Sequence, residues 1–249
     1  MDWHARYTQQ ANWTGDLRHY LFEKAELARA RRALEVGCGT GAILAGLKGQ
    51  PDFHGLDIDP AALAQCRVHA PGALLTRGDA LSLPYRAGAF DVIFCHFLLL
   101  WVRDPLRALL EMKRVTRPGG HILALAEPDY TARVDQPDAL VPLGRWQTES
   151  LRRRGADPSL GGRLGDLFSL AGIEIVETGP IQGAERATSP EGDPSPAERQ
   201  LEWAVLESDL AGSVSSEDLQ KMKSLDEEAW ARGDRRLQVP TYFAWGKIC

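Results

Sequence analysis

Three glycines and one carboxylate stand together in the segment from Glu35 to Gly41, which reads Glu-Val-Gly-Cys-Gly-Thr-Gly. Glycines at this spacing let the chain turn tightly and approach a ligand where a Cβ atom would clash. A helix that begins after such a turn favours an anion at its N-terminus. A carboxylate is a poor neighbour for pyrophosphate, so Glu35 favours a nucleoside cofactor that carries a cationic group.

The glycine turn alone leaves two cofactor classes open. Gly37, Gly39 and Ala42 also fit the G-x-G-x-x-[GA] pattern of dinucleotide-binding proteins. Asp57 follows at the distance expected of an acid that binds ribose hydroxyls. Helix capping is the alternative role for Asp57, although Asp59 is better placed for it. The turn therefore predicts a nucleoside cofactor without saying which one.

A second acid follows the third expected strand. Asp79 stands in Gly78-Asp79-Ala80, where its carboxylate can accept a hydrogen bond from an exocyclic amine such as that of adenine. A plain turn is the alternative interpretation.

Strand-like and helix-like segments alternate along the chain, a pattern typical of a parallel sheet covered by helices. The expected strands are 33–36, 53–57, 73–76, 90–95, 121–126, 173–178 and 239–248. The expected helices are 16–30, capped by Thr14 or Asp16, then 42–48, 60–69, 105–115, 138–155, 163–171, 197–211 and 216–232. The sequence thus predicts an α/β fold, a Rossmann-like doubly wound sheet of seven mostly parallel strands with helices on both faces.

One domain is the simplest organisation of residues 1–249. Residues 1–30 are expected to form an N-terminal helical lid. The expected sheet core comprises 31–128, 173–181 and 239–249, and the expected helical cap over the substrate comprises 129–172 and 182–238. The stretch from Gly183 to Pro196 is rich in Gly, Ser and Pro, which predicts a mobile surface loop.

Composition and charge exclude several classes of protein. A net charge of −5 gives no electrostatic reason to expect a nucleic acid partner. No apolar run approaches the ~20 residues of a membrane span. The four cysteines lack C-x-x-C spacing, which favours reduced thiols and a cytoplasmic location over a metal site.

Five motifs, taken in order, resemble the class I S-adenosylmethionine-dependent methyltransferase family. They are Leu34–Gly41, Gly55–Pro60, Gly78–Ala80, Phe90–Ile93 and Arg117–Gly120. The resemblance spans about residues 31–127 and is very specific as a set. It is strongest to the small-molecule branch that includes ubiquinone and menaquinone methyltransferases.

The resemblance implies S-adenosyl-L-methionine as the cofactor. In that family the glycine turn passes under the methionine part, and the acids matching Asp57 and Asp79 bind the ribose and the adenine amine. Glu35 matches the acid near the cofactor's amino group. The cofactor-binding positions expected in this chain are Tyr7, Arg18, Glu35, Gly37, Cys38, Gly39, Gly41, Asp57, Ile58, Gly78, Asp79, Ala80, Cys95 and His96.

The N-terminal segment resembles the leading helix with which family members close the cofactor cleft. Tyr7, Thr14, Arg18 and Tyr20 are its expected lid residues. Arg18 has two possible roles, an ion pair with the methionine carboxylate or a salt bridge on the helix surface.

Methyl transfer needs little covalent help from a protein, because the sulfonium carries its own leaving group. The protein holds the acceptor atom in line and excludes water. A proton acceptor is required only for a protonated nucleophile, and the candidates are His96, Glu127 and Asp129. Cofactor contact or packing is the alternative for His96, and loop capping is the alternative for the two acids.

Aromatic residues of the expected cap are the candidate substrate contacts. Tyr130, Trp146, Trp203 and Trp230 are predicted to wall a pocket for a planar or cationic acceptor; core packing is the alternative for each. No Asn-Pro-Pro-Tyr motif follows the fourth strand, where Cys95-His96-Phe97-Leu98 stands instead. This counts against methyltransferases that modify bases or glutamine side chains.

The sequence therefore predicts an enzyme that transfers a methyl group to a small organic acceptor by in-line displacement and releases S-adenosylhomocysteine. A nicotinamide-dependent oxidoreductase and a non-catalytic S-adenosylmethionine-binding protein are the alternatives. We expect no metal, no nucleic acid partner, and a monomer or homodimer. Oxygen, nitrogen, carbon and sulfur all stay open as the acceptor atom.

Overall fold

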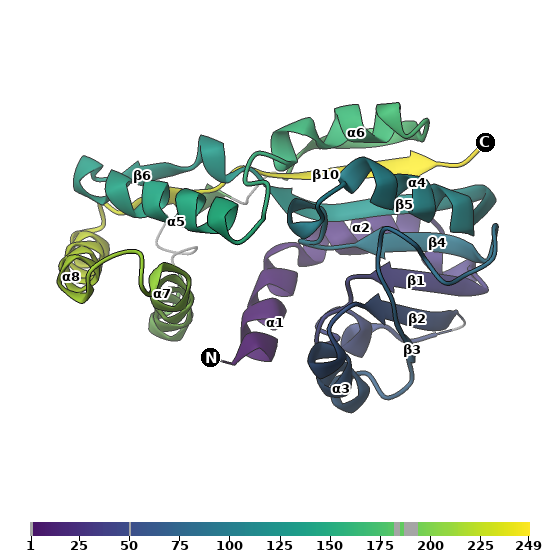
Figure 1. Ribbon diagram of the computed structural model, residues 1–249, viewed down its shortest axis with the longest axis horizontal. Helices are drawn as coiled ribbons and strands as arrows, with labels where there is room; N and C mark the ends of the chain where they lie inside the picture. The colour runs from purple at the N-terminus through teal and green to yellow at the C-terminus, as the bar shows by residue number, and fades with distance from the viewer. Residues whose placement is uncertain (1, 50, 182–184, 187–193) are drawn as a thin grey trace.

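A seven-stranded sheet forms the centre of the larger lobe of the protein (Figure 1). The computed structural model describes residues 2–49, 51–181, 185–186 and 194–249. The strands are β1 (Arg32–Val36), β2 (Asp52–Asp57), β3 (Leu74–Arg77), β4 (Phe90–Cys95), β5 (Thr116–Pro128), β7 (Glu174–Pro180) and β10 (Thr241–Lys247). Their order is β3-β2-β1-β4-β5-β10-β7, and only β10 runs antiparallel to its neighbours. The predicted fold class is confirmed.

Each face of this sheet is buried by its own pair of helices. Helices α4 (Pro105–Val115) and α6 (Leu164–Leu170) cover one hydrophobic cluster. Helices α2 (Gly15–Lys24) and α3 (Pro60–His69) cover the other. Successive strand residues alternate between the two clusters, as the period of two in a strand requires. On β4, for example, Ile93 belongs to the first cluster and Phe94 to the second.

Short polar caps set the starts of the crossover helices. Asp59 accepts a hydrogen bond from the N–H of Ala61 at 2.8 Å, so it caps α3 as expected. Asp104 does the same for α4 through the N–H of Arg107 at 2.9 Å. A proline follows each cap in the first turn, where its missing N–H costs nothing.

Two helix predictions near the N-terminus are wrong. The segment 42–48 forms only the 3₁₀ turn η2 (Leu44–Gly46), because glycine at 46 and 49 disfavours a longer helix. In place of one helix over 16–30, α1 (Trp3–Trp13) and α2 are separated at Thr14, and the 3₁₀ turn η1 (Leu27–Arg29) follows. Glu26 interrupts the helical backbone between α2 and η1, because its φ angle is +51°.

The smaller lobe, called the cap below, packs α5 (Val141–Arg153), α7 (Pro196–Leu210) and α8 (Ser216–Arg232) together. It also contains a three-stranded sheet of order β6-β9-β8, made by β6 (Val134–Gln136), β9 (Arg236–Gln238) and β8 (Glu185–Arg186). These strands were not predicted, because two or three residues are too few to show alternation. Most of the predicted loop at 183–196 lies outside the described residues.

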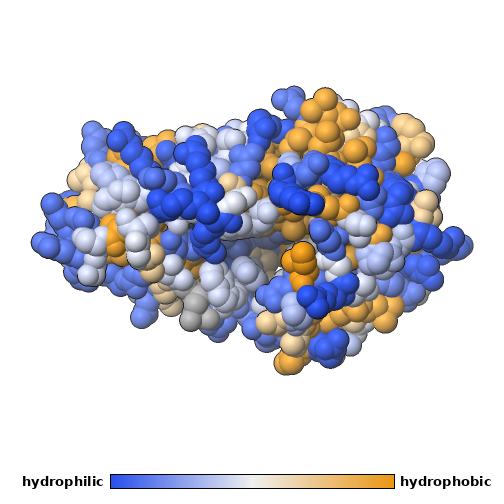
Figure 2. Space-filling model, in the orientation of Figure 1, coloured by the Kyte–Doolittle hydropathy of each residue, from blue (hydrophilic) through white to orange (hydrophobic). Residues whose placement is uncertain are grey.

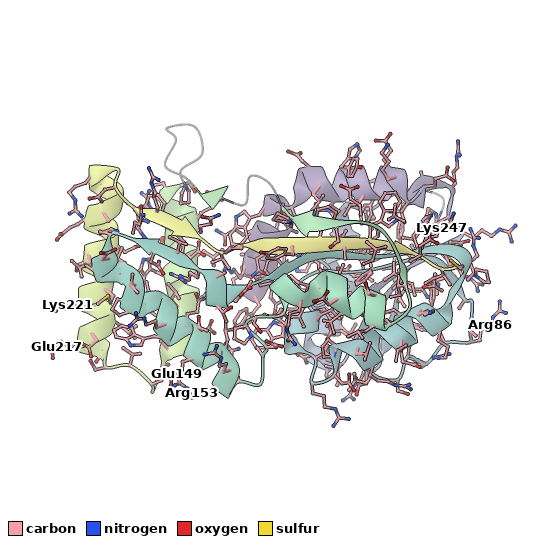
Figure 3. All side chains as sticks on the ribbon, turned by 90° about the horizontal axis from the view of Figure 1, so that it is seen from above. Arg86, Glu149, Arg153, Glu217, Lys221 and Lys247 are labelled. Atoms are coloured by element: carbon pink, nitrogen blue, oxygen red, sulfur yellow. The ribbon has the colours of Figure 1, made fainter. Side chains whose placement is uncertain are left out.

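Cap and sheet lobe lie end to end (Figure 3). Glu149, Arg153, Glu217 and Lys221 mark the cap end, and Arg86 and Lys247 mark the opposite end of the molecule. Helix α1 stands between the two lobes beside α7 (Figure 1). No helix within the described part of the chain is long and apolar enough to cross a membrane.

Candidate functional site

The glycine turn after β1 has a backbone that only glycine adopts readily. The φ angles of Gly37, Gly39 and Gly41 are +74°, +50° and +82°. A Cβ atom on Gly37 would lie 2.6 Å from Cδ1 of Leu98, and one on Gly39 would lie 3.4 Å from the Tyr7 ring. The turn is therefore closed over by two segments from elsewhere in the chain.

Asp57 links this turn to the end of β2. Its Oδ2 accepts a hydrogen bond from the N–H of Gly39 at 2.7 Å, and its Oδ1 accepts one from Asp59 at 2.9 Å. Each carboxylate oxygen keeps a further lone pair for a ligand hydroxyl. Ile58, the next residue, is 62% exposed and lies open at the same edge of the sheet.

Asp79 makes the contact expected of a turn residue. Its Oδ1 accepts from the N–H of Leu81 at 2.9 Å, and its side chain is exposed. Gly78 before it packs closely, since a Cβ there would lie 2.8 Å from Leu56, while Ala80 after it is buried. The adenine-binding role of Asp79 stays a prediction.

Glu35 is a buried acid with one oxygen left over. The residue is 3% exposed, and Oε2 has no hydrogen-bond partner among the described residues. Burial raises the pKa of Glu35 well above its ordinary value, and the nearby Arg18 guanidinium opposes this rise. An unsatisfied buried acceptor costs about 1–3 kcal/mol. A ligand that brings a donor or cationic group to Oε2 fits this place.

Helix α1 covers the glycine turn as the expected lid. The Tyr7 ring faces Gly39, and burial, with added repulsion from Asp57 and Asp59, raises the pKa of its phenol. Nδ1 of His4 lies 2.8 Å from Oγ1 of Thr40, within the turn. The ring of His4 also stacks on His69 of α3 at 3.4 Å between centroids.

The structure gives different outcomes for Arg18 and Tyr20, two of the residues predicted to belong to the lid. Arg18 donates from Nη1 to the carbonyl of Ala11 at 2.6 Å and to Thr14 at 3.3 Å, and the described residues provide no ion pair for it. The surface salt bridge is therefore absent there, and binding of the methionine carboxylate stays a prediction. Tyr20 is wrong as a lid residue, because it is exposed and donates to Glu177 of β7 at 2.9 Å.

The segment after β4 meets the lid at His96. Nε2 of His96 lies 3.0 Å from Oγ1 of Thr14. Burial and the Arg18 charge lower the pKa of His96 to about 3, so the ring is neutral at physiological pH. Phe97 holds the turn with a φ of +51°, which is unusual for a residue other than glycine. Cys95 before it and Cys38 in the glycine turn are buried.

Glu127 and Asp129 make the contacts of capping residues. Oε1 of Glu127 accepts from the N–H groups of Leu98 and Leu99 at 3.0 and 2.8 Å, and Oε2 accepts from Leu100 at 3.2 Å. Burial raises the pKa of Glu127 to about 7, against the effect of these donors. Asp129 caps the 3₁₀ turn η4 (Tyr130–Ala132). These contacts support the loop-capping alternative for both acids.

The three aromatic substrate candidates lie in different surroundings. Tyr130 is half-buried and lines a surface pocket with Arg133, Gly144 and Thr148. Trp203 is 4% exposed in the hydrophobic cluster of the cap, and its Nε1 donates to Asp226 at 2.8 Å. Trp146 is half-buried against the same cluster. The structure therefore gives Trp203 the surroundings of a core residue.

Figure 2 shows a hollow near the middle of the molecule, and side chains also join the cap to the rest of the chain. Arg154 pairs with Asp209 of α7 and stacks over the Trp101 ring at 5.2 Å. Arg6 of α1 lies 3.5 Å from Glu202 of α7. Sequence analysis missed these contacts, because the partners of each ion pair are far apart along the chain.

Comparison with known proteins adds independent evidence. Residues 34–124 match a family profile described as a methyltransferase domain. This segment of the chain therefore carries a methyltransferase domain. The match covers β1 to most of β5 and contains the glycine turn, Asp57, Asp79 and His96. No group of residues suited to a metal ion is found in the described part of the chain.

The chain is similar to several curated proteins over part of its length. It is 33% identical over 126 residues to a malonyl-[acyl-carrier protein] O-methyltransferase of Halorhodospira halophila, which covers 47% of this chain and 43% of that protein. It is 32% identical over 135 residues to the demethylmenaquinone methyltransferase of Shouchella clausii. This match covers 51% of this chain and 56% of that protein. The chain thus spans about half the length of these relatives.

The fold extends beyond the part matched in sequence. A crystal structure of phosphoethanolamine N-methyltransferase 2 from Haemonchus contortus, in complex with S-adenosyl-L-methionine, superimposes with a TM-score of 0.56. It is 18% identical and covers 88% of this chain, and the chain covers 48% of it. This likeness concerns the fold alone.

Proposed function

We propose that the protein transfers the methyl group of S-adenosylmethionine to a small organic acceptor and releases S-adenosylhomocysteine. The observation that carries the proposal is the pairing of the glycine turn with the buried, unpartnered Oε2 of Glu35. A pyrophosphate would add negative charge beside this acid, whereas the amino group of S-adenosylmethionine would supply a donor and a positive charge.

The chain's own residues then have separable tasks. Asp57 is proposed to bind the ribose, Glu35 the amino group and Arg18 the carboxylate of the cofactor. When bound, the cofactor supplies an electrophilic methyl group with a neutral thioether as leaving group. Tyr7 and α1 exclude water over the glycine turn, which strengthens the electrostatic contacts inside.

The small size of the acceptor is supported by the hollow between the lobes and by the relatives. Demethylmenaquinone methyltransferase is named for a small molecule and is the relative that supports this part of the proposal. Tyr130 is half-buried beside a surface pocket, whereas Trp203 is 4% exposed and hydrogen-bonded to Asp226, so we propose Tyr130 as an acceptor contact before Trp203.

Calorimetry separates this proposal from the nicotinamide alternative. We expect S-adenosylhomocysteine to bind with micromolar affinity and NAD(H) to show no heat of binding. Binding of NAD(H) without binding of S-adenosylhomocysteine would overturn the proposal.

Substitution of Asp57 tests the cofactor site directly. Asp57→Ala removes a charged acceptor, so S-adenosylhomocysteine affinity should fall by roughly 1–3 kcal/mol, about 5- to 150-fold. Asp52→Ala, on the same strand but exposed beside Arg32, is the control and should leave affinity unchanged. Because Asp57 also holds the turn, circular dichroism must show both variants folded. Equal affinities of the two variants would remove Asp57 from the site.

A further inference from the structure

The hydroxyl of Thr14 stands where the two N-terminal helices meet the end of β4. Its Oγ1 lies 3.0 Å from Nε2 of His96, 3.2 Å from the carbonyl oxygen of Ala11 and 3.3 Å from Nη1 of Arg18. A threonine hydroxyl has one proton to donate and two lone pairs with which to accept. The donor or acceptor character of each partner therefore decides which one takes the hydroxyl proton and which ones donate to its lone pairs.

Two of these partners have fixed roles. The carbonyl of Ala11 only accepts, and the guanidinium of Arg18 only donates. Oγ1 thus donates its proton to Ala11 and accepts one from Arg18, which leaves a single lone pair for His96. In that contact Nε2 must carry the proton. The Ala11 carbonyl also accepts from Nη1 of Arg18 at 2.6 Å, and this arrangement is the one in which all three contacts of Oγ1 are hydrogen bonds.

The other nitrogen of His96 then carries a free lone pair. Within the described residues no hydrogen bond reaches Nδ1, and Nδ1 is not among the fully buried polar atoms that lack a partner. The residue itself is half-buried. This lone pair is therefore open to a ligand.

The segment that carries His96 is in direct contact with the cofactor turn. Leu98, two residues on, packs where a Cβ of Gly37 would be, at 2.6 Å. Phe97 between them has a left-handed backbone and donates its N–H to the carbonyl of Ala126 at 2.9 Å. Backbone strain of this kind persists where surrounding contacts over-determine it, and it clusters at active sites.

We propose that Thr14 is a positioning residue that holds His96 in the Nε2-protonated tautomer, so that Nδ1 accepts a hydrogen bond from an O–H or N–H group of the methyl acceptor. The inference rests on the proposed methyl transfer and narrows the acceptor to protic oxygen or nitrogen nucleophiles. A lone pair of the acceptor atom forms the bond to the methyl carbon, and the carbon–sulfur bonding pair stays on sulfur. The methylated acceptor then carries one proton too many and releases it to water, while Nδ1 only orients the O–H or N–H group.

The burial of His96 and the nearby charge of Arg18 decide whether the ring can take up that proton. Burial and the Arg18 charge lower the pKa of His96 to about 3, so the ring accepts a hydrogen bond without retaining a proton at neutral pH. Thr14, Arg18 and the Phe97 ring lie next to it. This favours His96 as a group that orients the nucleophile by accepting its hydrogen bond and does not take up its proton.

Nitrogen-15 NMR of protein labelled at histidine tests the tautomer without any acceptor. His96→Asn assigns the signal, which we expect to show a protonated Nε2 and an unprotonated Nδ1 at pH 7. Thr14→Val should shift His96 toward a mixture of tautomers, and Thr14→Ser should restore the native pattern. Thr40→Val is the matched control, because Thr40 contacts His4 and should change that signal alone. A protonated Nδ1 in the native protein, or no response to Thr14→Val, would overturn the proposal.

A second arm measures the acceptor class. Release of S-adenosylhomocysteine is followed with a panel of small phenols, primary amines, thiols and activated-carbon nucleophiles. We expect turnover of phenols or amines only, with kcat lowered roughly 10- to 100-fold by Thr14→Val and rescued by Thr14→Ser. Turnover of a thiol or carbon acceptor that is indifferent to Thr14→Val would overturn the proposal.

Two different results would contradict the proposed methyl transfer and the proposed role of Thr14. Absence of S-adenosylhomocysteine binding to the native protein would contradict the proposed function and leave the tautomer measurement intact. Normal binding together with the wrong tautomer would contradict only the role of Thr14.

Discussion

The sheet lobe and the cap are stabilised by different kinds of contact. Each face of the sheet buries a large apolar cluster formed by alternating strand residues and two helices. The cap has a smaller apolar cluster and adds a buried charge network. In it, the Arg235 side chain, 1% exposed, pairs with Asp135 at 2.8 Å and Asp226 at 2.6 Å. Arg133 pairs with the same Asp135 at 2.7 Å.

The two kinds of contact have different effects on the structure. Apolar clusters stabilise any arrangement that buries them, whereas buried ion pairs require particular partners. Asp135 lies on β6, Asp226 on α8, and Arg235 just before β9, so the network joins three cap elements. We infer that this network fixes the position of α8 relative to the three-stranded sheet, while the glycine turn depends on the sheet lobe.

The largest expected effect comes from breaking the cap network. Arg235→Met leaves Asp135 and Asp226 buried with less counter-charge, so we expect a loss of roughly 3–5 kcal/mol in the free energy of unfolding. Urea unfolding measures the loss, and calorimetry with S-adenosylhomocysteine tests whether the cofactor site persists.

Arg236→Met is the control for that experiment. It removes the same charge from the exposed neighbour on β9 and should change stability by no more than ~0.5 kcal/mol. Equal stability of the two variants would show that the network does not hold the cap together.

An intermediate effect is expected at Glu127, at the edge of the sheet lobe. Its pKa is about 7 in the folded protein against an ordinary value of 4.5. Between these pH values the folded state binds the extra proton, so this residue's contribution to stability is present below about pH 4.5 and lost as pH rises to 7. The loss is at most about 3 kcal/mol.

Glu127→Gln isolates this contribution, because the amide does not titrate. Measured from pH 4.5 to 8, the free energy of unfolding of the native protein should fall relative to that of the variant as pH rises, by up to about 3 kcal/mol. The difference between the two proteins cancels the opposite slope from His96, whose lowered pKa makes stability rise with pH between about 3 and 6.5. Parallel curves would contradict the raised pKa of Glu127.

The smallest effect tests whether Trp203 belongs to the cap core or to the acceptor site. Trp203→Phe keeps a ring but loses the hydrogen bond to Asp226, so stability should fall by about 1 kcal/mol. A double-mutant cycle with Asp226→Asn measures the pairwise energy. Unchanged KM for an acceptor found in the panel supports the core assignment, and a raised KM with unchanged stability would reverse it.

Local sequence determined the sheet lobe to a large extent. The bounds of Phe90–Cys95, Pro60–His69 and Pro105–Val115 were predicted correctly, because alternation, Asp-Pro starts and short turns act within a few residues. The glycine turn and the placement of Asp57 at the end of β2 followed from the same local patterns.

Only the tertiary structure decided the contacts that join distant segments. The sequence offered Thr14 as a helix cap or lid residue and Glu127 as a base or loop cap, but it did not give their partners: Thr14 contacts His96, 82 residues away, and Glu127 binds the N–H groups of residues 98–100. The cap network has the same character, since Asp135 and Arg235 are 100 residues apart. Hydrogen bonds and ion pairs of this kind leave no periodic trace in a sequence, because they depend on where packing brings two side chains together.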